Sequence, residues 1–171
     1  MSQYYVAFYR NKNRLNVVSR LIEYFENRPH SHVEIVKSLS GTFEDSISWG
    51  STWPESRRIR LEEMKKHYKI ERLVPLRIML PDSSCEIILD GLCGKPYSFV
   101  QLILAGIKIL AKGSVSWLST VKPNLSKYLI CTELAGIFMQ EACGYRFEKS
   151  PELLSLEEIE TIALKNLLEN V

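Results

Sequence analysis

The residues best suited to chemistry in this 171-residue chain are a histidine, a glutamate and a cysteine. His32 and Glu34 belong to the stretch HVEIV at residues 32–36, where polar and apolar residues alternate as in a β-strand. The imidazole and the carboxylate therefore share one face of the predicted strand. Cys131 follows the stretch YLI at residues 128–130 and begins a predicted helix. These are the residue types that a general base, an orienting group and a nucleophile require.

The predicted position of Cys131 matters because a helix N-terminus carries a partial positive charge and free N–H groups. Such a position favours the thiolate form of a cysteine, and the N–H groups can bind an oxyanion. His32 would act as the general base, and Glu34 or a group on the neighbouring strand would orient it. A plainer interpretation also fits: the cysteine packs as a small buried hydrophobe, and the histidine and glutamate have only structural roles. Spacing alone does not decide between the two.

Three motifs in order resemble one known family. They are SHVEIV at 31–36, GKPY at 94–97 and CTELA at 131–135. The chain is similar in these motifs to the circularly permuted branch of the NlpC-type papain-like cysteine peptidases, which includes the YiiX-like amidases and many phage-encoded cell-wall hydrolases. In that branch the histidine strand precedes the cysteine helix, as here. The resemblance covers roughly residues 4 to 155 and implies a papain-like α+β fold in a single domain spanning 1–171.

The resemblance also implies roles for individual residues. Cys131 matches the nucleophile, His32 the general base, and Tyr97 a tyrosine that lies beside the active site in relatives. The third polar residue departs from the family pattern, because relatives often place Glu, His or Asn where Ser48 stands. Glu34 is chemically the better partner for an imidazole, but side chains two apart on a strand stand parallel, about 6.6 Å apart at their Cα atoms. The sequence leaves both Glu34 and Ser48 open as the orienting residue.

The function expected from this resemblance is thiol-dependent hydrolysis of an amide bond in a peptide or a peptidoglycan-like substrate, with no metal or organic cofactor. Two alternatives stay open. One is a catalytically silent binding or assembly module on the same fold. The other is a lipid acyltransferase or thioesterase, suggested by the apolar stretch at residues 98–111.

Composition limits the remaining possibilities. The net charge of +2 argues against a nucleic-acid partner, and the four cysteines show no CxxC spacing that would indicate zinc. The apolar stretch at 98–111 is shorter than the roughly 20 residues that span a bilayer, so no integral membrane span is expected. The N-terminus lacks the pattern of a signal peptide, which favours a cytoplasmic protein, or the host cytoplasm if a phage encodes it. The sequence does not indicate an oligomeric state.

Hydrophobic periodicity predicts a small antiparallel sheet flanked by helices. The predicted strands are Tyr4 to Tyr9, His32 to Lys37, Thr42 to Trp49, Arg57 to Leu61 as an edge strand, and Tyr68 to Leu80 with a break at Pro75. The predicted helices are Arg14 to Glu26 (with Leu15, Val18, Ile22 and Phe25 on one stripe), Tyr97 to Lys112, Cys131 to Ala142, and a last one that opens with a capping box at Ser155 and Glu158.

Overall fold

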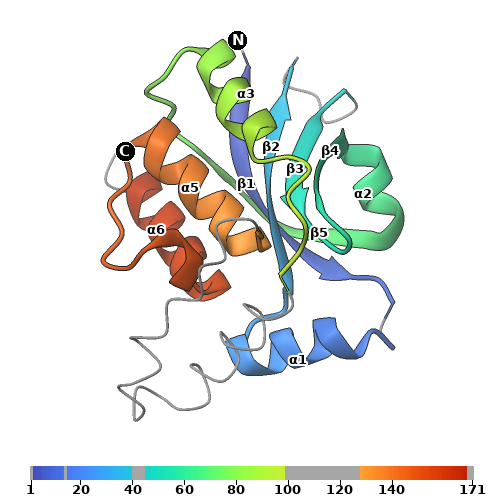
Figure 1. The fold of residues 1–171 in the computed structure, drawn as a ribbon. Helices are drawn as coiled ribbons and strands as arrows, with labels where there is room; N and C mark the ends of the chain where they lie inside the picture. Colours follow the sequence, from blue (N-terminus) through green and yellow to red (C-terminus); the bar gives the residue numbers. More distant parts are fainter. Residues whose placement is uncertain (1, 14, 40–44, 99–127, 169–171) are drawn as a thin grey trace.

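A computed structural model describes residues 2–13, 15–39, 45–98 and 128–168 (Figure 1). Within these residues the chain forms a five-stranded antiparallel sheet in the order β4-β3-β2-β1-β5. The strands are β1 (Gln3–Asn11), β2 (His32–Ser38), β3 (Ile47–Ser51), β4 (Ser56–Arg60) and β5 (Tyr68–Pro75). The helical elements are α1 (Val17–Glu26), α2 (Leu61–His67), α3 (Asp82–Gly91), α5 (Cys131–Cys143), the short 3-10 helix η2 (Pro151–Leu153) and α6 (Leu156–Leu168). The predicted α+β class is confirmed.

The sheet is packed on both faces. β2 is its central strand, and all seven of its residues are buried. Val33 and Ile35 face the larger core, which contains residues of α3, α5 and α6. Val36 faces a smaller core on the other side with Leu61 and Met64 of α2. Figure 1 shows the same division, with α3, α5 and α6 on one side of the sheet and α2 on the other. The alternation in β2 therefore sends its side chains into two separate layers.

Most predicted elements form where the patterns indicate. Each predicted strand overlaps an observed strand. The hairpin partner of β2 begins at Ile47, and β4 is the predicted edge strand. Helix α5 ends at Gly144, which adopts the left-handed conformation that favours glycine. The capping box of α6 is confirmed, because the backbone N–H of Glu158 donates to Ser155 Oγ at 3.1 Å and that of Ser155 donates to Glu158 Oε2 at 2.9 Å.

Three features differ from the predictions. Helices α2 and α3 are not predicted; α2 buries only Leu61 and Met64, which is too few for a visible period. The first helix begins at Val17 rather than residue 14, because Asn16 caps it by accepting a hydrogen bond from the Ser19 N–H at 3.0 Å. Tyr97 lies in a β-bridge rather than at a helix start, and the rest of the predicted helix lies outside the described residues.

Candidate active site

The backbone just before Cys131 is held by hydrogen bonds to two other segments. Leu129 forms a parallel β-bridge with Tyr97, and its N–H donates to the Pro96 carbonyl at 3.0 Å. Its carbonyl accepts a hydrogen bond from Ser51 Oγ, at the end of β3, at 2.8 Å. Cys131 is the first residue of α5 and is 7% exposed. This bonding fixes the position of Cys131 relative to the sheet.

The start of α5 leaves backbone donors close to the thiol. The N-cap residue is Ile130, which has no polar side chain to cap the helix. The first N–H groups of a helix have no partner within the helix itself. Together with the helix dipole, they favour negative charge near Cys131, either on its sulfur or on an oxygen bound beside it.

Glu34, rather than Ser48, contacts the imidazole of His32. His32 Nε2 lies 2.9 Å from Glu34 Oε1, and Ser48 Oγ donates a hydrogen bond to the other carboxylate oxygen, Glu34 Oε2. All three side chains are buried. Both candidates for the orienting residue therefore take part. Glu34 contacts the imidazole of His32, and Ser48 donates a hydrogen bond to Glu34.

The contact between His32 and Glu34 depends on local geometry, since side chains two apart on a regular strand stand parallel. The register between β1 and β5 shifts between Phe8 and Tyr9, directly beside the position where Tyr9 pairs with His32. Gly50 of β3 provides space, because a Cβ atom at this position would overlap the carboxylate of Glu34. Gly50 was not predicted to belong to the site, although a glycine inside a strand often marks a close approach of another group to the backbone.

The side chains of His32 and Cys131 meet, although they are far apart in the sequence. Burial alone would lower the pKa of His32, but the charge and hydrogen bond of the Cys131 sulfur, together with those of Glu34, outweigh burial. The pKa of His32 therefore lies well above its usual value, so the imidazolium form is favoured. Because Nε2 faces Glu34, Nδ1 is the ring nitrogen available to the thiol.

Three tyrosines surround this group. Tyr97 lies close enough that Cys131 raises the pKa of its phenol, after the larger effect of burial and together with Tyr68. The ring centroid of Tyr68 lies 5.5 Å from that of His32, and the ring of Tyr9 lies 6.0 Å away. Tyr97 was predicted to lie beside the site. Tyr9 and Tyr68 were not predicted to lie there. Only the pairing of β1 with β2 and with β5 brings these two tyrosines next to His32.

The other histidines and thiols have different surroundings. His67 is exposed, and His30 is buried near Glu160 of α6. Burial raises the pKa of Cys85 and Cys93, and burial together with Cys85 raises the pKa of Cys143 to about 12. The described residues contain no cluster of histidine, cysteine and carboxylate side chains suited to a metal ion.

Comparison with known proteins does not assign a family. No protein-family model matches this sequence, and no curated protein matches it at a significant level. Among the helices of the described segments, none has the length and apolar character needed to cross a lipid bilayer.

Proposed function

We propose that this protein is a thiol-dependent hydrolase of amide bonds, with Cys131 as the nucleophile, His32 as the general base and Glu34 as the residue that orients His32. The observation that carries the proposal is the contact series from the first residue of α5 through the imidazole to a buried carboxylate. A thiol, a base and an orienting group in this order form the arrangement used for covalent catalysis by cysteine.

The mechanism follows from these contacts. The Cys131 thiolate attacks the carbonyl carbon of the amide, while the imidazolium of His32 holds the proton. Backbone N–H groups at the start of α5 stabilise the oxyanion of the tetrahedral intermediate. Collapse of the intermediate breaks the C–N bond, and His32 donates its proton to the leaving amine. Neutral His32 then takes a proton from water, whose oxygen attacks the thioester; the acid leaves and the thiolate–imidazolium pair is restored.

The substrate class rests on the resemblance to permuted NlpC-type enzymes, which makes a peptide or a peptidoglycan-like peptide the first candidate. His32 and Cys131 are buried, and the tyrosines around them help to exclude water from the thiolate–imidazolium pair. Tyr97 is proposed to lie beside the bound carbonyl. The apolar stretch that suggested a lipid substrate lies outside the described residues, and the proposal does not depend on it.

Selective labelling of Cys131 tests the proposal. Iodoacetamide between about pH 6 and 7 reacts slowly with an ordinary thiol, whose pKa is about 8.5, and quickly with a thiolate held by an imidazolium. Mass spectrometry should find the label on the peptide containing Cys131. Labelling should be lost in Cys131→Ser and retained in Cys93→Ser, a matched control at a partly exposed thiol.

Labelling of Cys131 no faster than that of a free thiol would instead favour the silent binding module. If Cys131 is reactive, a panel of peptide, peptidoglycan-fragment and lipid-amide substrates then distinguishes the amide classes. Turnover of peptides by the parent chain, and none by Cys131→Ser, is the expected result.

A further inference from the structure

Of the apolar side chains that the described residues leave exposed, Trp53 is the largest. It lies in the turn between β3 and β4 and is 68% exposed. Trp49, four residues earlier, is fully buried, and its Nε1 donates a hydrogen bond to Asp90 at 2.7 Å. A tryptophan is highly buried on average, because its side chain carries so much apolar surface. The indole of Trp53 therefore presents apolar surface that the fold itself does not use.

The turn that carries Trp53 is bonded to the candidate active site. The Pro54 carbonyl accepts a hydrogen bond from the Tyr97 N–H at 2.9 Å. Tyr97 forms a β-bridge with Leu129, two residues before Cys131. Burial raises the pKa of the Tyr97 phenol most, and the nearby Cys131 raises it further. Trp53 is thus next in the chain to a residue that bonds to Tyr97, whose phenol lies near the thiol.

A second exposed aromatic side chain lies on the other side of Tyr97. Tyr128 is 42% exposed and immediately precedes Leu129, the bridge partner of Tyr97. In this parallel bridge the hydrogen bonds of Leu129 go to the residues before and after Tyr97, so the N–H of Tyr97 points to the opposite edge, toward Pro54. Exposed aromatic residues therefore precede the bonded residue on both segments that flank Tyr97.

The charges beside Trp53 do not select a charged ligand group. Glu55 is exposed and forms a β-bridge with Pro96, so it lies close to the partly exposed Lys95. These two opposite charges offset each other at the same edge. The exposed indole then gains most from a large apolar side chain, and above all from an aromatic ring, which adds an offset or edge-to-face ring contact to the burial of apolar surface.

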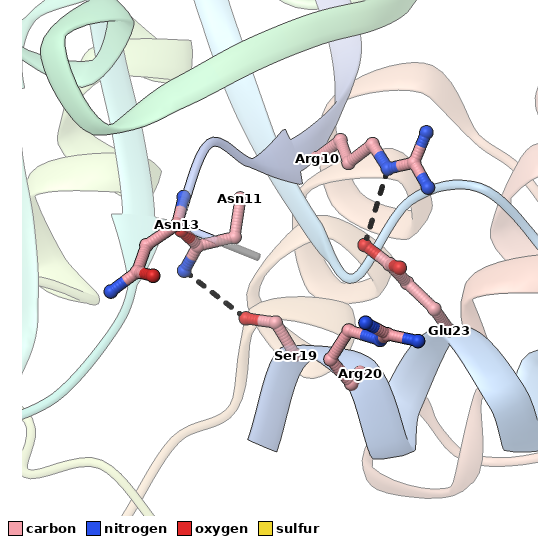
Figure 2. Close-up of a pocket in the computed structure, with 6 residues that line it drawn as sticks. All are labelled: Arg10, Asn11, Asn13, Ser19, Arg20 and Glu23. Atoms are coloured by element: carbon pink, nitrogen blue, oxygen red, sulfur yellow. Dashed lines mark hydrogen bonds and ion pairs between the residues drawn. The ribbon is translucent and has the colours of Figure 1, made fainter. Parts of the chain in front are cut away.

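The cavity shown in Figure 2 does not provide such a contact. It has a volume of about 240 Å³ and lies between α1 and the end of β1. The six described residues that line it are all polar or charged, and none belongs to the candidate active site. Arg10 Nε lies 3.7 Å from Glu23 Oε1 across it, and Asn11 Nδ2 donates to Ser19 Oγ at 3.2 Å. An apolar substrate side chain finds no matching surface there.

From these contacts we infer that Trp53 determines specificity by binding a large apolar side chain, above all an aromatic one, of the peptide substrate. This role rests on the proposed function, since it places that side chain relative to an amide held at Cys131. An extended peptide advances about 3.3–3.6 Å per residue. The side chain that meets Trp53 therefore belongs to a residue one or two positions from the scissile bond, with Tyr97 lying between the indole and the thiol.

Alkylation of Cys131 by matched reagents measures this contact without a known substrate. Acetyl-Phe-Gly and acetyl-Ala-Gly chloromethyl ketones cover the acyl side of the bond, and iodoacetyl-Gly-Phe and iodoacetyl-Gly-Ala amides cover the amine side. Mass spectrometry gives each rate at Cys131, and N-acetylcysteine gives the intrinsic ratio for each pair. The full chain should prefer the Phe reagent of one pair about tenfold beyond that ratio. Trp53→Ala should reduce this preference to within about twofold and leave the rate of the Ala reagent unchanged.

Two further variants show whether the indole itself is responsible. Tyr24→Ala removes an aromatic side chain that is 78% exposed on α1, and it should keep the full preference. Trp53→Phe should keep most of it, because a ring remains at this position. Circular dichroism confirms that each variant is folded, and a preference that Tyr24→Ala also abolishes would count against a specific contact at Trp53.

The ratio compares two reagents at one thiol, so it can be measured whether or not Cys131 is unusually reactive. Slow labelling that keeps the preference would refute the proposed hydrolase and leave the contact with Trp53 supported. Fast labelling without a preference in either pair, or with the same preference in Trp53→Ala, would overturn the role of Trp53 alone. A greater preference for reagents with Lys in place of Phe would assign the indole to a cationic group and also overturn it.

Discussion

His30 and His32 lie two residues apart, are both buried and each lie beside a buried glutamate, but their pKa values shift in opposite directions. His32 Nε2 is 2.9 Å from Glu34 Oε1, within hydrogen-bond distance. His30 Nε2 is 3.6 Å from Glu160 Oε2, which is too long for a hydrogen bond. Similar burial and similar residue types thus produce two different electrostatic environments.

The difference lies first in Cys131, whose sulfur raises the pKa of His32, and then in what else each glutamate contacts. Glu160 is shared with two cations, Arg72 at 2.7 Å and Arg28 at 3.4 Å. Burial lowers the pKa of His30; Glu160 opposes this, but Arg28 and Arg72 add to the lowering. Glu34 is contacted by the neutral Ser48, so its negative charge acts on His32. The pKa of His32 is therefore raised by Cys131 first and by Glu34 second, whereas two arginines oppose the effect of Glu160 on the pKa of His30.

The two groups also connect different parts of the fold. The carboxylate of Glu160 joins α6 to β5 through Arg72 and to the residues before β2 through Arg28. The His32 group instead joins β2 to the start of α5. The Glu160 group stabilises the packing of α6 against the sheet. The His32 group brings the side chains of the candidate active site together.

Replacing each histidine by alanine gives the largest expected contrast. His32→Ala should slow the labelling of Cys131 by iodoacetamide by roughly 10²–10⁴, because it removes both the base and the imidazolium that supports the thiolate. His30→Ala should leave the labelling rate of the folded protein within about threefold, because His30 contacts the Glu160 group and not Cys131. Equal losses in the two variants would refute the distinction.

Gly50→Ala should damage the His32 group through packing alone. A Cβ at position 50 would overlap the carboxylate of Glu34, so the side chain must move away from His32. We expect a loss of about 1–3 kcal/mol in unfolding free energy, measured with urea, and slower labelling of Cys131. Gly91→Ala on α3 is the control. No heavy atom lies within 4 Å of the added Cβ there, so stability should stay equal or rise by up to about 1 kcal/mol.

Glu34→Gln tests whether the carboxylate itself, rather than its position, supports His32. Acylation of Cys131 should slow at least tenfold, a loss of about 1.4 kcal/mol of transition-state stabilisation, because the imidazolium loses the negative charge of its hydrogen-bond partner. Ser48→Ala should slow the reaction less, since Ser48 contacts Glu34 and not the ring. A larger effect from Ser48→Ala than from Glu34→Gln would contradict this order.

The sheet and the helix of Cys131 could be predicted because period-2 alternation and helix end signals are local. The meeting of Cys131 with His32 could not be derived from local patterns, and only the family resemblance suggested it. The choice between Glu34 and Ser48 depended on the β2–β3 register and on the space at Gly50, neither of which sequence spacing reveals. The predicted apolar stripe of the first helix is only partly covered, because Ile22 packs against the core whereas Leu15 and Val18 are exposed. Periodicity shows that one side of a helix is apolar but not how much of that side the fold covers.

The smallest expected effect is on stability as a function of pH, where the two histidines should act with opposite signs. The pKa of His30 is lowered in the folded state, so its contribution is present above the unfolded pKa of about 6.5 and is lost as pH falls through the folded pKa. The pKa of His32 is raised, so its contribution is present below about pH 6.5 and is lost as pH rises through the folded pKa.

Two variants separate these contributions. Urea unfolding between about pH 5 and 9 should show that His30→Gln reduces the loss of stability on the acid side, and that Cys131→Ser reduces the loss on the alkaline side, because it removes the charge that raises the pKa of His32. Each effect should be about 1.4 kcal/mol per unit of pKa difference. NMR titration of the imidazoles checks the cause directly: in Cys131→Ser the pKa of His32 should fall while that of His30 stays below its ordinary value. If both histidines titrate at about 6.5 in the parent chain, the contrast between the two groups does not exist in solution.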